Sequence, residues 1–124
     1  MSFEICTTRR FSAAHTLRLP DGTFEPVHGH NWTVRVTVAS AGLDSMGTVM
    51  DFHMLEAAVD KILQPLHNRN LNEVQEMADL NPSAENVAFH FARRLLVAGV
   101  LPGGVRLLSV QVHETDDNYA VYRP

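Results

Sequence analysis

Residues 28–38 read His-Gly-His-Asn-Trp-Thr-Val-Arg-Val-Thr-Val, with histidine, tryptophan or valine at every even-numbered position. The odd-numbered positions carry glycine, asparagine, threonine and arginine. Successive side chains of a strand point to opposite faces, so this alternation is typical of a strand with one buried and one wet face. The stretch therefore predicts a half-buried strand from His28 to Val38, with His28 and His30 on the same face.

A second alternating stretch precedes this strand and runs from Phe3 to His15. Its pattern is imperfect, because Thr7 and Arg9 fall on the apolar face. Leu19-Pro-Asp-Gly-Thr23 supplies turn residues between the two stretches, so we expect an antiparallel pair. The apolar face of the first strand comprises Phe3, Ile5, Phe11, Ala13 and His15.

Two amphipathic helices are expected after the second strand. Asp51 is the expected N-cap of the first helix, which ends or bends near Pro65. A polar loop follows from His67 to Leu80. Asn81 and Pro82 are expected to start the second helix as cap and first helical residue. The apolar stripes consist of Leu55, Ala58, Val59, Ile62, Leu63 and Leu66 in the first helix, and Ala84, Val87, Ala88, Phe91, Leu95 and Ala98 in the second, which ends at Gly99.

Two further strands complete the expected fold. Leu108, Val110, Val112 and Glu114 share one face of the third strand, and Tyr119–Arg123 forms the fourth. The order ββααββ predicts an α+β fold, a four-stranded antiparallel sheet with two helices inserted between strands 2 and 3. The chain is short enough to form a single domain over residues 1–124. Both edges of such a sheet are open, which favours pairing with other copies.

The composition excludes several classes of protein. The chain has 14 acidic and 10 basic side chains and a net charge of −4, without a basic cluster suited to nucleic acid. No apolar stretch approaches the roughly 18 residues that span a bilayer, and no signal peptide is visible. A lone Cys6 excludes a disulfide framework and suits a reducing compartment. We therefore expect a cytoplasmic protein without nucleic-acid or membrane partners.

Seven histidines are the unusual feature, and three of them suggest a metal. His28 and His30 project from one strand face, and His15 at the end of the neighbouring strand could add a third nitrogen ligand. Three protein ligands with an open fourth position are typical of catalytic zinc. The alternative is a hydrogen-bonded His28–His30 pair with His15 unrelated, and spacing alone leaves both open. His53 and His90 have no partner pattern and are expected on exposed helix faces.

Two glutamates are candidates for the remaining chemistry. Glu114 follows apolar residues of core-facing parity, where a carboxylate could accept paired N–H donors from a flat, amide-like heterocycle. The alternative is that the strand ends at His113 and Glu114 turns to water. Glu25 stands three residues before His28, where a carboxylate beside a metal-bound substrate could act as general base. Its alternative is an ordinary solvated loop glutamate.

Several motifs together resemble the 6-pyruvoyl-tetrahydropterin synthase family, which includes 6-carboxy-tetrahydropterin synthase. The resemblance implies the tunnelling fold, zinc bound by His15, His28 and His30, a pterin ring anchored by Glu114, and a homo-hexamer built as a dimer of trimers, with active sites between subunits. The motifs are Phe11-Ser-Ala-Ala-His15, His28-Gly-His-Asn31, Gly47-Thr-Val-Met-Asp-Phe52, Leu71-Asn72, Asn81-Pro-Ser-Ala-Glu-Asn86 and Val112-His-Glu-Thr115.

Two departures from the family pattern concern the reaction. The family's catalytic cysteine is absent from the loop before His28, where Glu25-x-x-His-Gly-His resembles a subgroup with glutamate in its place. That subgroup converts 7,8-dihydroneopterin triphosphate to 6-hydroxymethyl-7,8-dihydropterin. The family's Asp-His pair reads His67-Asn68 here. Asn68 cannot shuttle protons, and His67 could do so only with a tautomer that no aspartate sets.

The resemblance leaves three hypotheses. The leading one is a zinc-dependent lyase that cleaves the side chain of 7,8-dihydroneopterin triphosphate or a close pterin, with Glu25 as base. The second is a 6-carboxy- or 6-pyruvoyl-tetrahydropterin synthase with rearranged acid–base residues, His67 among them. The third is a non-catalytic homologue that binds zinc and a pterin.

Overall fold

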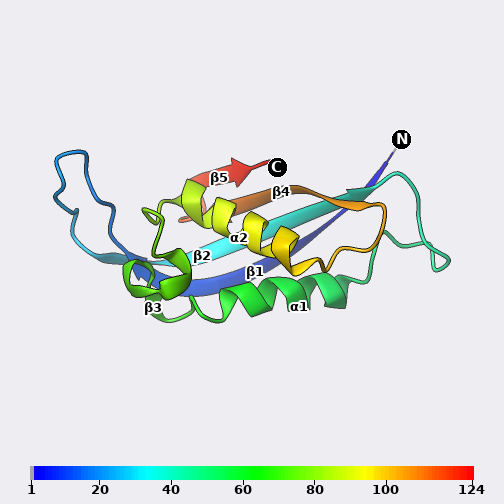
Figure 1. The fold of residues 1–124 in the computed structure, drawn as a ribbon, viewed down its shortest axis with the longest axis horizontal. Coiled ribbons are helices and arrows are strands. Elements are labelled where there is room, and N and C mark those ends of the chain that lie inside the picture. Colours follow the sequence, from blue (N-terminus) through cyan, green and yellow to red (C-terminus); the bar gives the residue numbers. More distant parts are fainter. Residues whose placement is uncertain (1) are drawn as a thin grey trace.

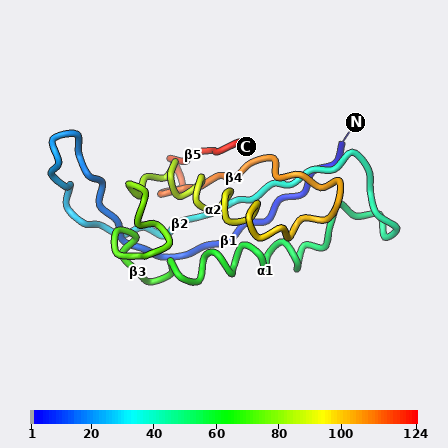
Figure 2. The backbone as a smooth tube through the Cα atoms, in the orientation of Figure 1, coloured from blue at the N-terminus to red at the C-terminus, as the bar shows by residue number. Residues whose placement is uncertain are grey.

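The computed structural model describes residues 2–124 as one sheet with two helices (Figures 1 and 2). No helix within these residues is long and apolar enough to cross a membrane. The strands are β1 (Phe3–His15), β2 (His28–Ser40), β3 (Arg69–Asn70), β4 (Val105–His113) and β5 (Tyr119–Tyr122). The helices are α1 (Phe52–Leu63) and α2 (Ala84–Ala98), with 3₁₀ turns η1 (Leu71–Glu73) and η2 (Gln75–Met77) between them.

The sheet has the strand order β3-β1-β2-β4-β5. Strands β1, β2, β4 and β5 pair in antiparallel fashion, which confirms the expected ββααββ core. The fifth strand, β3, is an addition within the expected polar loop and runs parallel to β1 opposite Ala13 and Ala14. A strand of two residues is too short to show an alternating pattern in the sequence. It forms because the chain runs alongside β1 at this point.

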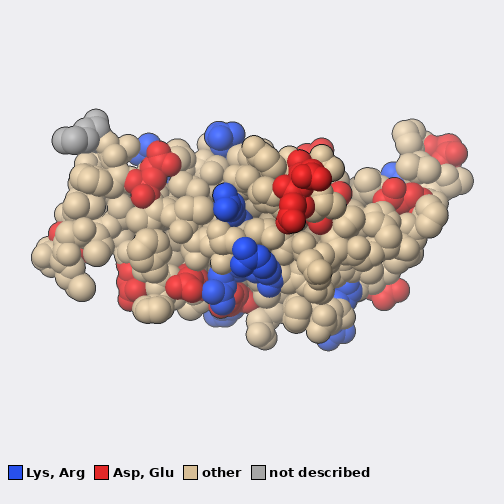
Figure 3. All heavy atoms as spheres, turned by 180° about the vertical axis from the view of Figure 1, so that it is seen from behind, with Lys and Arg blue, Asp and Glu red and all other residues tan. Residues whose placement is uncertain are grey.

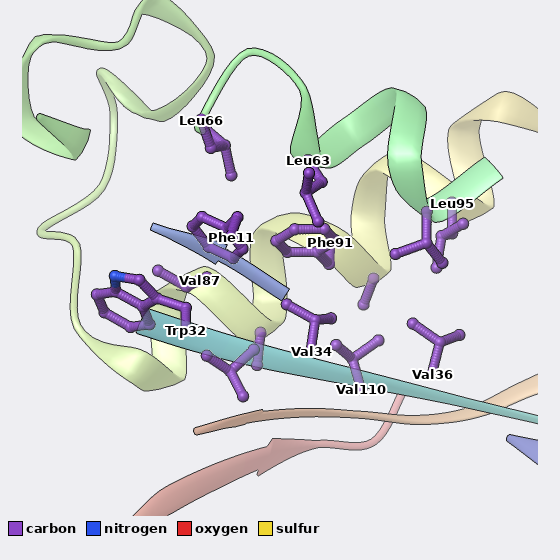
Figure 4. Packing of buried hydrophobic residues seen from close by; sticks show 14 of the residues in the cluster. Phe11, Trp32, Val34, Val36, Leu63, Leu66, Val87, Phe91, Leu95 and Val110 are labelled. Carbon is purple, nitrogen blue, oxygen red and sulfur yellow. The ribbon is translucent and has the colours of Figure 1, made fainter. Parts of the chain in front are cut away.

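The core lies between the sheet and the two helices, which cover the same face (Figure 1). The even-numbered side chains of β2 from Trp32 to Val38 are all fully buried, as their alternation predicts. In Figure 4, Phe11, Trp32 and Phe91 pack together above the valines of the sheet. This packing holds β1, β2 and α2 as one unit.

Both helices lie on one face of the sheet (Figure 1), and Figure 3 shows the molecule from the other side. Basic and acidic side chains are interspersed across it, and Arg10 and Arg35 are exposed on β1 and β2. Thr8 pairs with Arg35, and Arg10 pairs with Thr33, so the two arginines lie diagonally across neighbouring strands. This is the wet face that the alternation predicts.

The prediction that Leu108 shares the buried face of β4 with Val110 and Val112 is wrong. The β2–β4 register shifts between Thr37 and Val38, so that Val38 pairs with Leu107 and Thr37 with Ser109. Leu107 is buried in place of Leu108. An extra residue in one strand reverses which side chains face the core beyond that point. Nothing in the sequence near Leu108 indicates this extra residue.

The helix ends are partly as expected. Asp51 caps α1 by accepting a hydrogen bond from His53 N–H, and Gly99 ends α2 in the left-handed region at φ 64°. The expectation that Asn81 and Pro82 begin the second helix is wrong. Ser83 is the cap, accepting from Asn86 N–H, and the helix begins at Ala84.

His90 was expected on an exposed helix face, and that expectation is also wrong. It is 1% exposed, and its Nδ1 has no hydrogen-bond partner within residues 2–124. Burial, together with the positive charges of Arg93 and Arg94, lowers the pKa of His90 to about 4. The buried side of α2 is broader than its apolar stripe because this helix contacts both the sheet and α1.

Candidate functional site

The three candidate metal ligands meet where β1 ends and β2 begins. His15 pairs directly with His28 across the two strands, and His30 pairs with Ala13. One ring nitrogen from each histidine lies within 4.8 Å of the other two. The antiparallel register therefore assembles from two strand ends the three-nitrogen group that the sequence suggests.

Backbone carbonyls orient two of these rings. His15 Nδ1 lies 2.7 Å from the Pro82 carbonyl oxygen, and His28 Nδ1 lies 2.9 Å from that of Pro26. A neutral ring that donates its Nδ1–H leaves a lone pair on Nε2. The Nε2 atoms of His15 and His28 lie 3.0 Å apart, so their lone pairs face each other. A cation bound by both nitrogens would remove the repulsion between these lone pairs.

His30 completes the group from a half-buried position, between the burial of His15 and the exposure of His28. Its Nε2 is buried and has no hydrogen-bond partner within residues 2–124. Burial is the main cause that lowers the pKa of His30, which favours the neutral, ligating form. An orphaned buried nitrogen beside two oriented imidazoles fits zinc, which takes three histidines and keeps an open position.

Trp32 packs against the rings of His15 and His30. Its indole N–H donates to the Ala13 carbonyl oxygen at 3.1 Å, and its ring meets His15 and His30 edge-on at centroid distances of 4.9 and 5.4 Å. Trp32 is fully buried. It therefore restricts the orientations of two candidate ligands.

Glu25 lies close to this group, in the long β1–β2 connection. Its Oε1 accepts a hydrogen bond from Leu17 N–H at 3.1 Å, and its side chain is half-buried. Its charge acts to raise the pKa of His30, against the larger effect of burial. The carboxylate is thus held near the histidines by a backbone donor.

Glu114 faces the histidines from the end of β4. Its Oε1 lies 3.8 Å from His15 Nε2, and 29% of its side chain is exposed. It also lines a cavity of about 420 Å³ with Ala84, Glu85, Asn118, Tyr119, Ala120 and Val121. Of the two orientations that the sequence left open, the side chain adopts the one toward the site.

Glu85 is a cavity residue that sequence reasoning did not identify as a candidate. It stands in the first turn of α2, where an acidic residue is expected simply because it complements the helix dipole. Because that structural role alone explains the glutamate, the sequence does not mark Glu85 as a functional residue. Only the packing of α2 beside β5 shows that Glu85 and Glu114 share a cavity.

His67 lies apart from the other candidates. Ser12 N–H donates to its Nδ1 at 3.1 Å, so a neutral His67 carries its proton on Nε2. The expectation of an unset tautomer is therefore wrong, because the Ser12 N–H donor fixes it. An aspartate would accept a ring N–H, whereas this donor requires a lone pair on the nitrogen that it faces. Within residues 2–124, no hydrogen bond or ion pair joins His67 to the three histidines, Glu25 or Glu114.

A larger cavity lies at the other end of the sheet. It measures about 970 Å³, and Phe3, Met46 and Phe52 are among its lining residues. None of the candidate site residues lines it. The candidate chemistry therefore belongs to the smaller, polar hollows around the histidine end.

Comparison with known sequences identifies close relatives. Residues 4–124 match the family described as 6-pyruvoyl tetrahydropterin synthase. The human 6-pyruvoyl tetrahydrobiopterin synthase is 41% identical over 98 residues, which are 77% of this chain and 66% of that protein, so the chain spans just under two thirds of that relative. The 6-carboxy-5,6,7,8-tetrahydropterin synthase of Synechocystis is 37% identical over 117 residues, covering 90% of this chain and 86% of that protein.

Comparison with solved structures agrees on the fold. The Caenorhabditis elegans 6-pyruvoyl tetrahydropterin synthase superposes with a TM-score of 0.83 at 23% identity, over 100% of this chain and 96% of that one. A Plasmodium vivax synthase variant, in which a catalytic glutamate is replaced by alanine, has a TM-score of 0.77 at 17% identity, over 100% and 98%. The chain belongs to the 6-pyruvoyl tetrahydropterin synthase family.

Proposed function

We propose that the protein is a zinc-dependent lyase that acts on 7,8-dihydroneopterin triphosphate or a close pterin and releases 6-hydroxymethyl-7,8-dihydropterin. The observation that carries the proposal is the convergence of three imidazole nitrogens with Glu25 and Glu114 around them. His15, His28 and His30 would hold the zinc. Bound there, the metal would act as a Lewis acid toward the side-chain hydroxyls of the substrate.

The protein's own groups would divide the remaining work. Glu114 accepts two N–H groups from the amidine-like edge of the pterin, in the cavity it shares with Glu85. Glu25 takes the proton of the hydroxyl whose carbon becomes a carbonyl. The bond between the first two side-chain carbons then breaks, its electron pair remains on the carbon attached to the ring, and that carbon takes up a proton.

The choice of Glu25 as base rests on three observations. The connection between β1 and β2 contains no cysteine, and Glu25 is the acidic residue that acts on His30 from that connection. The Plasmodium vivax relative also has a catalytic glutamate. A carboxylate base at this place supports carbon–carbon cleavage without a thiolate.

The test is product identification after incubation of the zinc-loaded protein with 7,8-dihydroneopterin triphosphate. We expect 6-hydroxymethyl-7,8-dihydropterin, and we expect Glu25→Ala to lower kcat at least about 100-fold, because a general base contributes about 10²–10⁴-fold. Exposed Glu73→Ala serves as the matched control and leaves the rate unchanged. Unchanged turnover in Glu25→Ala would remove Glu25 as the base.

A second candidate function is that of a 6-carboxy- or 6-pyruvoyl-type synthase, since relatives of both names are similar to this chain. In that case the product would be 6-carboxy- or 6-pyruvoyl-tetrahydropterin, and His67→Ala would abolish its formation. Pterin binding without any product in long incubations would instead indicate a non-catalytic homologue. Product identity therefore separates all three.

We also propose that the active protein is a homo-hexamer. β3 covers β1 only at Ala13 and Ala14, and β5 forms the opposite edge of the sheet, so both edges are open to another copy. An edge that is left unpaired is a template for strand addition. In such an assembly a neighbouring chain could bring its own His67 toward the histidine group.

A further inference from the structure

The chain leaves the sheet immediately after His15. The pairing of β1 with β2 ends at the His15–His28 pair, and the β1–β2 connection extends beyond the end of the sheet (Figure 1). Residues 16–18 nevertheless keep hydrogen bonds of the kind a strand makes. Their partners on one side are two asparagine side chains.

Asn72 holds Thr16 through both of its amide atoms. Thr16 N–H donates to Asn72 Oδ1 at 2.9 Å, and Asn72 Nδ2 donates to the Thr16 carbonyl oxygen at 2.8 Å. Asn70 in turn accepts from Asn72 N–H at 3.0 Å, which steadies the 3₁₀ turn carrying Asn72. A side-chain amide thus replaces a paired strand residue.

Asn81 repeats the same pair of contacts two residues further on. Arg18 N–H donates to Asn81 Oδ1 at 2.9 Å, and Asn81 Nδ2 donates to the Arg18 carbonyl oxygen at 3.1 Å. Its own carbonyl accepts from Asn86 Nδ2 at 2.8 Å. The next residue, Pro82, is the one whose carbonyl orients His15.

Glu25 occupies the other side of the same segment. Leu17 N–H donates to the Glu25 carboxylate at 3.1 Å, and Glu25 N–H donates to the Leu17 carbonyl oxygen at 3.1 Å. The hydroxyl of Thr16 donates to the Glu25 carbonyl oxygen. Backbone groups of an extended chain alternate in direction, so the asparagines and Glu25 grip opposite edges of residues 16–18.

We propose that Asn72 and Asn81 are positioning residues, which act through residues 16–18 on the Glu25 carboxylate and, for Asn81, through Pro82 on His15. The catalytic effect rests on the proposed reaction, and the effect on the metal site rests only on the proposed binding of zinc by the three histidines. Both asparagines are exposed, so their replacement leaves no core cavity. Their structural effect therefore comes from hydrogen bonds to the backbone and not from packing in the core.

The experiment compares Asn72→Ala, Asn81→Ala and the control Gln75→Ala, an exposed amide without a side-chain hydrogen bond within residues 2–124. We expect amide hydrogen exchange at Leu17 to accelerate about tenfold in both asparagine variants, with Val34 and Val36 unchanged. Zinc affinity, measured by chelator competition, should fall about tenfold in Asn81→Ala, as for loss of support to a ligating histidine. On substrate, kcat should fall with KM unchanged.

Exchange rates and zinc affinities equal to those of Gln75→Ala would overturn the proposal. Faster exchange at Val34 and Val36 as well would also overturn it, because the role would then be general stability. If the wild type turns over no pterin, the proposed function fails, while exchange and zinc affinity still decide the positioning role. Asn72→Asp and Asn81→Asp, which keep the acceptor oxygen and lose the donor, replace any alanine variant that does not fold.

Discussion

His90 makes the stability of the fold depend on pH. Its pKa is about 4 in the folded protein and ~6.5 when unfolded. A histidine with a lowered folded pKa contributes stability above pH 6.5 that is lost as pH falls toward 4. This contribution amounts to about 3 kcal/mol. We expect urea unfolding of His90→Leu to lose about 3 kcal/mol less than wild type between pH 7 and pH 4.

The control for this prediction is exposed His53→Leu, which keeps the wild-type pH dependence. Both proteins are compared without added metal, so that titration of the other histidines is common to them. At pH 7, His90→Leu should be neutral or slightly stabilising, because it removes a buried nitrogen that has no partner. The same pH dependence in wild type and His90→Leu would contradict the prediction.

The histidine group leads to a prediction about metal removal. Free zinc at 100 times its Kd should stabilise the wild type by about 2.7 kcal/mol. This increment should disappear on chelation and in His30→Ala, which removes the buried Nε2 proposed as a ligand. Thermal unfolding with zinc or with chelator measures it, and His53→Ala should retain the full increment. A zinc effect that persists in His30→Ala would place the metal elsewhere.

At the scale of elements, the start of α2 has a cap that can be tested directly. Ser83 Oγ accepts from Asn86 N–H at 3.1 Å. Removing such a cap costs about 1 kcal/mol, whereas glycine at the same position costs a few tenths. We expect that order for Ser83→Ala and Ser83→Gly in urea unfolding, with exposed Ser45→Ala as control. Equal stability of Ser83→Ala and wild type would contradict the assignment of the cap.

At the scale of the whole molecule, the open sheet edges predict self-association. One chain has a mass of 13.8 kDa, and light scattering after size exclusion should give about six times this value. The reason is that unpaired edge strands gain hydrogen bonds when they pair with another copy. A mass equal to one chain at micromolar concentration would contradict the proposed hexamer. It would also leave His67 without a route to the site.

The sequence alone determined the four antiparallel strands, both helices and the three histidines of the candidate metal group. The alternation of a strand and the 3.6-residue repeat of a helix can be read from neighbouring residues. Each pattern shows which face of its own element is apolar and will be buried. His15, His28 and His30 followed because two adjacent antiparallel strands bring their joined ends together. The family motifs gave roles to Glu25 and Glu114, two candidates that spacing alone left ambiguous.

Only the tertiary structure decided the features that depend on contacts between distant residues. The irregularity at Leu108, the burial of His90 and the tautomer of His67 each arise from a partner element rather than from neighbours in sequence. The same holds for Asn81, which local chemistry marks as a helix cap but which instead pairs with Arg18. A polar side chain bonds whichever backbone group packing brings within reach, and that choice is made only when the chain has folded.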